Sequence, residues 1–481
     1  MQDRIRKLER RARALDPDAP RRGQWRDAAT AYSERFLESL DQAPAYRAGA
    51  GVADGALTEP FGEQPSSIER LLSIIDAEVV APGINAASPG SFGYIPGGGV
   101  WPAALGDFLA DVINRYAGVF YAAPGAVRLE MQLVAWLSGL VGYPSGDAGG
   151  DLTSGGSIAN LSAIVAAREA RNLRAAEVPR HVVYSSAQCH HSVDKALRIA
   201  GLAECVRRSI PVDGRWRMDA PALAAQIAAD RRRGLVPWLV IATAGTTDVG
   251  AVDPLGDIAG IAGDEGLWLH VDAAYGGAFL LCTDGRRALA GIERSDSVVI
   301  DPHKGLFLPF GSGAVVVRER ASLARANRYH ADYMQDAFQP GVEPSPADLS
   351  PELTRPFRGL RLWLPLKLFG LAPFRAALEE KLLLARHFHA RLGELPRWEV
   401  GPAPDLSVVT YRYLPDKGDP DTFNRRLLDA VQADGRVFIS STRLGGRHTL
   451  RLAVLHFRTH LDEVELAIEL LEHHARQLRV C

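Results

Sequence analysis

Two stretches of the chain decide its fold: LWLHVDAAYGG at residues 267–277 and DSVVIDPHKG at residues 296–305. Each contains a short, mostly apolar run typical of a buried strand, followed by small or polar residues. The first acidic side chain after each run is Asp272 or Asp301. Ligands of parallel α/β sheets bind beyond the carboxyl ends of the strands. These two aspartates therefore mark the edge where a site is expected.

The same pattern continues on both sides of these stretches. Strands are expected at 181–185, 204–209, 238–243, 267–271, 296–300 and 313–318. Helical patterns at 157–172, 190–200, 219–233 and 254–265 separate several of them. Strands that alternate with helices predict an α/β fold with a mostly parallel central sheet covered by helices.

Three domains are predicted along the chain. Residues 1–99 hold short helices (2–15, 23–40 and 66–80) and form an N-terminal helical segment that packs on a partner subunit. Residues 100–365 form a large domain around the sheet, which includes a long loop at 330–356. Residues 366–481 form a small C-terminal α+β domain. A helix is expected from 358 to about 392, across the boundary between these two domains. The expected segments after it are 406–413, 421–433, 436–440, 449–455 and 461–478.

Composition excludes several classes of function. The 55 basic and 57 acidic residues give a net charge of −2, which argues against a nucleic-acid partner that is bound through its phosphates. No apolar run approaches the length of a membrane span, and the N-terminus lacks the apolar core of a secretory signal. The four cysteines show no paired spacing. We therefore expect a cytoplasmic protein with no membrane partner.

The turn Thr153-Ser154-Gly155-Gly156-Ser157 precedes a well-formed helical pattern. Glycines let backbone N–H groups approach a ligand, and a helix N-terminus favours an anion. The turn is thus a candidate phosphate cradle, although an ordinary helix cap has the same composition. It lacks the Gly-Lys-Ser/Thr of a P-loop and the GxGxxG of a dinucleotide-binding fold.

Three further side chains lie at expected strand ends. His190 follows the strand at 181–185 and could stack on a planar ring or serve a structural role; no ligand set completes a metal site there. Asp272 needs a cationic partner if it is buried, but it could also cap a helix or bind a metal. Lys304 is one of only six lysines. A desolvated lysine is a nucleophile toward carbonyls, whereas a surface lysine is not.

Together these features supply what pyridoxal 5′-phosphate (PLP) requires. The helix N-terminus takes the phosphate, His190 covers one face of the ring, Asp272 keeps the pyridine nitrogen protonated, and Lys304 holds the aldehyde as a Schiff base. Each alone is weak, but the four occur in order and at strand ends. The residues therefore predict a PLP enzyme.

The chain resembles the PLP-dependent group II amino-acid decarboxylases, which include aromatic-L-amino-acid and glutamate decarboxylases. The matching stretches span about 90–455 and are TSGGSIAN, CHHSVDKA, IATAGTTDVGAVDP, LWLHVDAAYGG, DSVVIDPHKG, PFRGLRLW and TLRLAV. The resemblance implies PLP fold type I, an obligate homodimer with active sites at the interface, and a lyase of amino-acid metabolism. It implies that the chain decarboxylates an L-amino acid to the amine and CO₂.

The resemblance also assigns roles to individual residues. It gives the Schiff base to Lys304, with His303 beside it, ring stacking to His190, and the pyridinium partner to Asp272. The residues implied to hold the phosphate or line the cofactor are Gly156, Ser157, Thr246, Ala274 and Asp301. The residues implied to meet the substrate are Arg451 at the α-carboxylate, Tyr94, Ile95 and Pro96 at the side chain, and Tyr116, Gly118 and Phe120 from the partner.

The aromatic residues Tyr94, Trp101, Tyr116, Phe120 and Tyr121 favour an aromatic substrate, although core packing would also explain them. The three glycines at 97–99 could instead leave space for a larger side chain.

The chain departs from the family at one position. The aromatic members use a loop tyrosine to protonate the substrate carbon, and the matching position falls near Pro346. No tyrosine lies between 334 and 410; Tyr333 precedes the loop and Phe338 is the aromatic residue within it. Either Tyr333, His190 or water supplies the proton, or the carbanion reacts with O₂ and gives an aldehyde, ammonia and peroxide. A non-decarboxylating PLP lyase or aminotransferase is a further alternative.

Overall fold

The computed structural model describes residues 1–49, 55–328 and 343–480, so Tyr333 and Phe338 lie outside the described residues. The chain divides into two compact units. One contains residues 1–91 with 430–438, and the other contains residues 92–429 with 439–481. Within the described ranges, no helix is long and apolar enough to cross a membrane.

The first unit is a set of helices with a two-stranded antiparallel sheet, β1 Tyr46–Arg47 and β2 Gly83–Ile84. Its helices are α1 Gln2–Ala12, α2 Ala19–Ser39 and α3 Ile68–Ile74, the last prolonged by a π-helix at Ile75–Val80. The Ser67 hydroxyl accepts a hydrogen bond from the Arg70 amide. This cap begins α3 where the Ser-Ser pair predicts a helix start.

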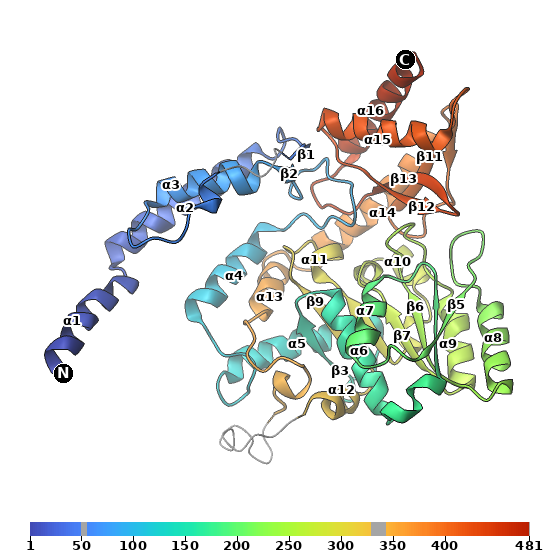
Figure 1. Ribbon diagram of the computed structural model, residues 1–481, viewed down its shortest axis with the longest axis horizontal. Coiled ribbons are helices and arrows are strands. Elements are labelled where there is room, and N and C mark those ends of the chain that lie inside the picture. Colours follow the sequence, from blue (N-terminus) through green and yellow to red (C-terminus); the bar gives the residue numbers. More distant parts are fainter. Residues whose placement is uncertain (50–54, 329–342, 481) are drawn as a thin grey trace. The chain divides into compact units, whose positions relative to one another are not determined.

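The second unit is built on a seven-stranded sheet with the order β3-β9-β8-β7-β6-β4-β5. Figure 1 shows strands of this sheet with helices packed beside them. All neighbouring pairs from β8 to β5 are parallel, whereas β9 runs antiparallel to both β8 and β3. The predicted mostly parallel sheet is therefore confirmed. The strands are β3 Gly149–Thr153, β4 His181–Ser186, β5 Val206–Ile210, β6 Val236–Thr243, β7 Trp268–Asp272, β8 Ser297–Ile300 and β9 Gly313–Val317.

Helices cover both faces of this sheet. Alternate residues of a strand point to opposite faces, and Val182 and Val183 of β4 belong to different apolar clusters. One cluster includes α8 Ala220–Arg232 and α9 Leu255–Asp264. The other includes α6 Gly156–Ala170 and α7 Ser192–Ile199. The buried apolar strands are thus fixed between two helical layers.

Further helices complete the second unit. Those near the sheet are α4 Trp101–Ile113, α5 Pro124–Val141, α10 Thr283–Ala288, α11 Pro302–Gly305, α12 Arg320–Asn327 and α13 Gly359–Phe369. A small antiparallel sheet follows with the order β10-β11-β13-β12. Its strands are β10 Trp398–Val400, β11 Val408–Tyr413, β12 Ser440–Leu444 and β13 Arg447–Ala453. The C-terminal helices are α14 Ala372–Gly393, α15 Pro420–Asp434 and α16 Leu461–Val480, and residues 430–434 of α15 are counted with the first unit.

The structure departs from the sequence-based expectation in three places. Strand β3 was not predicted, because Gly-Gly-Asp-Leu-Thr has little β propensity, yet all five of its residues are buried. The helix expected from 358 to 392 is two helices, because Gly370 adopts a positive φ of 67° between α13 and α14. The strand expected at 436–440 lies instead at Ser440–Leu444.

Candidate functional site

A cavity of about 280 Å³ lies where parallel strands of the large sheet end. Its lining comes from five segments, within 154–160, 190–192, 243–247, 272–275 and 301–304. These segments follow β3, β4, β6, β7 and β8. The site predicted at the carboxyl edge of the sheet is therefore a cavity built from five of the seven stretches quoted above, and PFRGLRLW and TLRLAV do not line it.

One wall of the cavity is the turn between β3 and α6. Gly155 has a φ of 152°, a backbone conformation that side chains rarely adopt. A Cβ atom on Gly156 would lie 2.9 Å from Asp301 Oδ2. The hydroxyl of Thr153 contacts both the amide and the carbonyl of Gly155. Because the first N–H groups of α6 have no intrahelical acceptor, this turn can receive an anion.

Lys304 faces this turn from the end of β8. Its Nζ lies 2.9 Å from Asp301 Oδ2, and that carboxylate is almost completely buried. His303 Nδ1 donates to the carbonyl of Ser312, which leaves His303 Nε2 with a lone pair, 3.8 Å from the same carboxylate oxygen. Burial lowers the pKa of His303, so its ring is neutral at neutral pH.

Asp272 is the last residue of β7 and is 5% exposed. Its Oδ1 accepts from the Ala274 amide at 3.1 Å, and its Oδ2 accepts from Asn160 Nδ2 at 2.9 Å. No lysine, arginine or histidine within the described residues forms an ion pair with it. Burying a carboxylate with two neutral donors and no cation costs free energy. A cationic group of a ligand would offset this cost at Asp272.

His190 enters the cavity beside Asp272. Its Nδ1 lies 2.8 Å from Ser192 Oγ and also accepts from the Ser192 amide at 3.3 Å. Since an N–H group points at Nδ1, this nitrogen is the acceptor and the ring hydrogen is on Nε2. Burial lowers the pKa of His190. The structure therefore presents a neutral ring with an Nε2–H donor.

The other predicted cofactor contacts, Gly156, Ser157 and Ala274, also line the cavity, but Thr246 does not. Thr246 is completely buried, and its hydroxyl accepts from the Ala251 amide. The residues before and after Thr246, Gly245 and Thr247, line the cavity instead. Ser154 and Gly155 of the predicted cradle line it too. Lining residues that sequence reasoning missed are Ile158, Asn160, Ser192, Thr243, Gly245, Thr247 and Tyr275. All of them lie within or next to the quoted motifs, so their position in these motifs could have identified them.

Arg451 lies behind the wall formed by Thr247. Its guanidinium donates to the carbonyls of Thr247 (2.6 Å), Tyr94 (3.0 Å) and Asp248 (3.2 Å), and to Ser440 Oγ (2.8 Å). Arg451 is 3% exposed and, within the described ranges, has no carboxylate partner. A guanidinium has five N–H groups, so one on Nη1 is left for a ligand.

The segment 94–99 lies against the backbone of His303 and Lys304. Tyr94 has a positive φ of 56° and is 62% exposed, whereas Ile95 and Pro96 are buried. A Cβ atom on Gly97 would lie 2.2 Å from the carbonyl oxygen of His303. The expectation that the glycines at 97–99 leave space for a ligand is therefore wrong at Gly97, because the backbone of 303–304 occupies that space.

The predicted partner-side residues lie outside the cavity lining. Tyr116 donates to the Leu353 carbonyl, the Gly118 carbonyl accepts from the Ala347 amide, and the Phe120 amide donates to Ser345 Oγ. These contacts join the 114–120 loop to the segment that begins at 343. That segment contains a capped 3₁₀ turn at Pro346–Asp348, where the family's loop tyrosine was expected.

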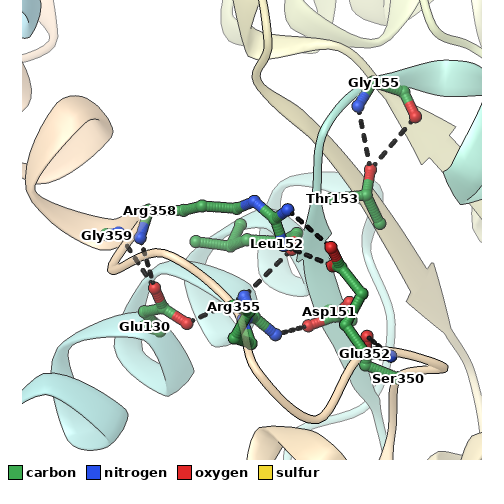
Figure 2. Close-up of polar contacts among 10 residues, drawn as sticks. All are labelled: Glu130, Asp151, Leu152, Thr153, Gly155, Ser350, Glu352, Arg355, Arg358 and Gly359. Carbon is green, nitrogen blue, oxygen red and sulfur yellow. Dashed lines mark hydrogen bonds and ion pairs between the residues drawn. The ribbon is translucent and has the colours of Figure 1, made fainter. Parts of the chain in front are cut away.

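A buried ion-pair network fastens the next part of this segment to β3 (Figure 2). Arg355 contacts Glu130 of α5 at 2.9 Å, Asp151 of β3, and the Leu152 carbonyl at 2.9 Å. The side chains of Arg355, Glu130 and Asp151 are at most 1% exposed. Arg358 also donates to the Leu152 carbonyl. Strand β3 is therefore held directly before the anion-binding turn.

The cavity fits PLP by its own chemistry. It joins a glycine turn at a helix N-terminus, the amine of Lys304, and a buried Asp272 carboxylate that has no cation among the described residues. Thr243 Oγ1 and Asp301 Oδ1 are buried and have no hydrogen-bond partner in the described part of the chain. A phosphate, an aldehyde and a protonated ring nitrogen would meet the first three of these groups.

Comparison with known proteins agrees with this chemistry. Residues 56–414 match the pyridoxal-dependent decarboxylase conserved domain. The chain is 36% identical over 414 residues to an aromatic-L-amino-acid decarboxylase of Bacillus atrophaeus, covering 85% of each. It is 29% identical over 441 residues to a phenylacetaldehyde synthase of Arabidopsis thaliana, covering 89% of this chain and 90% of that one. The solved structure of Oryza sativa TDC with PLP and tryptamine superposes with a TM-score of 0.90 at 28% sequence identity. The superposition covers 96% of this chain and 99% of that chain.

Proposed function

Because the chain belongs to the pyridoxal-dependent decarboxylase family, whose members are PLP-dependent carboxy-lyases, we propose that it converts an aromatic L-amino acid to the amine and CO₂. The observation that carries the proposal is the buried Asp272 carboxylate, which shares one cavity with Lys304 and the anion-binding turn. The aromatic preference is supported by the relative from Bacillus atrophaeus, which is named for aromatic amino acids.

The residues that would hold the cofactor have separate tasks. The amides at the start of α6, with Gly156 and Ser157, would receive the phosphate, and Lys304 would hold the aldehyde carbon. Asp272 would keep the ring nitrogen protonated, and the neutral ring of His190 would lie against the cofactor. When bound, the cofactor supplies an electron-withdrawing ring that stabilises negative charge at the substrate Cα. Asp301 pairs with the Lys304 amine and so orients it.

Arg451 would bind the α-carboxylate of the substrate. Four of the five guanidinium N–H groups already donate to protein acceptors, and one N–H of Nη1 does not. The contact with the carboxylate would therefore be a single charge-assisted hydrogen bond, unless the guanidinium breaks one of its hydrogen bonds to a backbone carbonyl. Holding the carboxylate at a fixed place selects which bond at Cα is aligned for cleavage. Tyr94, Ile95 and Pro96 are tied to the same guanidinium through the Tyr94 carbonyl. The side-chain pocket and the carboxylate site are thus mechanically connected.

His190 can deliver the proton that Cα requires after CO₂ has left. Its hydrogen is on Nε2, because Ser192 occupies Nδ1. The ring stays neutral in this step only if Nδ1 takes up a proton as the Nε2 hydrogen leaves, and Ser192 Oγ, 2.8 Å from Nδ1, would relay that proton from water. The overall reaction therefore consumes one proton from solvent, which His190 would pass to Cα.

We also propose that the active enzyme is a homodimer with Phe120 contributed by the partner subunit. In its own subunit the 114–120 loop is fixed to residues 345–353 and lies outside the cavity lining. A loop held this firmly can present an aromatic side chain to a second copy. The mass of the holoenzyme in analytical ultracentrifugation tests this.

A second candidate function is decarboxylation coupled to oxidation. The absence of tyrosine between 334 and 410 and the likeness to a phenylacetaldehyde synthase favour it. The overall reaction would consume the amino acid, O₂ and water, and it would release the aldehyde, CO₂, ammonia and hydrogen peroxide. Two electrons pass from the amino acid to O₂ in this case, whereas none do in simple decarboxylation.

Product analysis separates the two functions. Purified protein with added PLP is incubated in air with L-tryptophan, L-tyrosine, L-phenylalanine, L-glutamate and their D-enantiomers. Amine, aldehyde and peroxide are quantified by mass spectrometry and a coupled peroxide assay. An aromatic amine without peroxide supports the first function. Aldehyde with equimolar peroxide supports the second, and turnover of L-glutamate alone contradicts the aromatic assignment.

Lys304→Ala is the control for the cofactor assignment. The variant should lose the visible absorbance of the lysine-linked cofactor and its turnover, because no other described lysine lines the cavity. A variant with an unchanged spectrum would contradict the role of Lys304.

A further inference from the structure

Asn160 is a buried amide in the second turn of α6, 1% exposed. Asparagine is a poor helix former, and burying an amide is costly unless its hydrogen bonds are made. This side chain makes three. Its Nδ2 lies 2.9 Å from Asp272 Oδ2 and 3.1 Å from Ser192 Oγ, and its Oδ1 lies 2.8 Å from His270 Nε2.

The chemistry of these partners fixes the orientation of the amide. A carboxylate only accepts hydrogen bonds, so the group that faces Asp272 must be the NH₂ of Asn160. Its oxygen then faces His270 Nε2, which must carry the ring hydrogen. Burial lowers the pKa of His270 to about 4, so the ring is neutral and its Nδ1 accepts from Ser297 Oγ at 2.8 Å. Ser297 in turn accepts from Trp268 Nε1 at 3.0 Å.

The hydrogen bonds therefore run in one direction. They lead from Trp268 through Ser297, His270 and Asn160 to Asp272. At Asn160 they divide, because the second amide hydrogen points at Ser192 Oγ, which contacts His190 Nδ1. Asn160 thus contacts Asp272, the proposed partner of the cofactor ring nitrogen. Through Ser192 it is also linked to His190, which is proposed to lie against the face of the cofactor ring.

We propose that Asn160 is a positioning residue that holds Asp272 for the ring nitrogen of the cofactor and keeps the Nε2–H form of His190. The inference rests on the proposed roles of those two residues. It assigns no contact with substrate to Asn160. Because hydrogen bonds to charged groups stabilise more than neutral ones, most of the effect should pass through Asp272.

The test compares cofactor binding in matched variants of the full chain. PLP is titrated into each apoprotein, and the dissociation constant and the visible absorbance band are recorded. Asn160→Ala should raise the dissociation constant for PLP about tenfold or more and shift the band. Ser162→Ala is the control, because Ser162 is buried on the same helix and its hydroxyl has no partner in the described chain. It should bind PLP as the wild type does.

A double-variant cycle separates positioning from general stability. If Asn160 acts through Asp272, Asn160→Ala should cause little further loss of PLP affinity when Asp272→Ala is already present. Additive losses would overturn the proposal, as would wild-type affinity and an unchanged band in Asn160→Ala. Asn160→Ser, which keeps one hydroxyl donor, carries the same test if the alanine variant does not fold. If the wild type binds no PLP, the proposed function fails first.

Discussion

The buried network around Arg355 allows a quantitative prediction. Arg355→Met keeps much of the side-chain volume but leaves the carboxylates of Glu130 and Asp151 buried without their cation. Both carboxylates are at most 1% exposed, so water cannot replace the lost partner. Breaking a buried pair on one side costs about 3–5 kcal/mol, and we expect a loss of that size in the free energy of unfolding at pH 8.

The loss should depend on pH in a definite direction. Burial raises the pKa of Glu130 to about 7, although the Arg355 guanidinium opposes this. Without Arg355 the pKa rises further, so the variant takes up a proton more readily than the wild type. A raised folded-state pKa stabilises the fold at low pH, and this contribution disappears as the pH rises through that value. The deficit of Arg355→Met should therefore be smaller at pH 6 than at pH 8.

Urea unfolding of the apoprotein, followed by circular dichroism at both pH values, measures these quantities. Arg231→Met is a suitable control, since Arg231 pairs with Glu265 at an exposed position, and exposed pairs contribute about 0–1 kcal/mol. Adding Glu130→Gln to Arg355→Met should recover part of the loss by removing one uncompensated charge. A deficit below about 1 kcal/mol at pH 8, or one equal at both pH values, would refute the reasoning.

Three further predictions concern the site. Burial lowers the pKa of His270 from 6.5 to about 4, so the free energy of unfolding of the wild type should fall by up to about 3 kcal/mol as the pH is lowered from 6.5 to 4. His270→Gln should lack this fall in urea titrations, and an equal fall would contradict the buried neutral ring. Arg451→Lys should raise KM for the amino acid about tenfold or more with a smaller change in kcat; an unchanged KM would exclude the carboxylate role. Gly155→Ala should weaken PLP binding, since its φ of 152° is strained for alanine; calorimetry that finds wild-type affinity would contradict a preformed anion site.

Sequence patterns predicted most of the large sheet, because its buried strands are runs of Val, Ile and Leu. They missed β3, whose glycines carry little β signal and whose burial depends on pairing with β9. They also singled out Lys304, Asp272 and His190, since each lies at the end of a recognisable strand or four residues beyond it. The partners of these residues were not predictable. Asn160 and Asp272 are far apart in the sequence, and only the fold brings the amide within 2.9 Å of the carboxylate.

Strand β9 also dictates when the site can be assembled during synthesis of the chain. Strand β3 is at the edge of the sheet, and its one neighbour there is β9, with Gly149 opposite Val317. Strand β3 therefore cannot pair until the ribosome has made residues up to 317, and the anion-binding turn after β3 is not held in position before then. During that interval β3 is an unpaired edge, the kind of surface that aggregates in nascent chains. Its two glycines and Asp151 make this strand a poor template for such pairing.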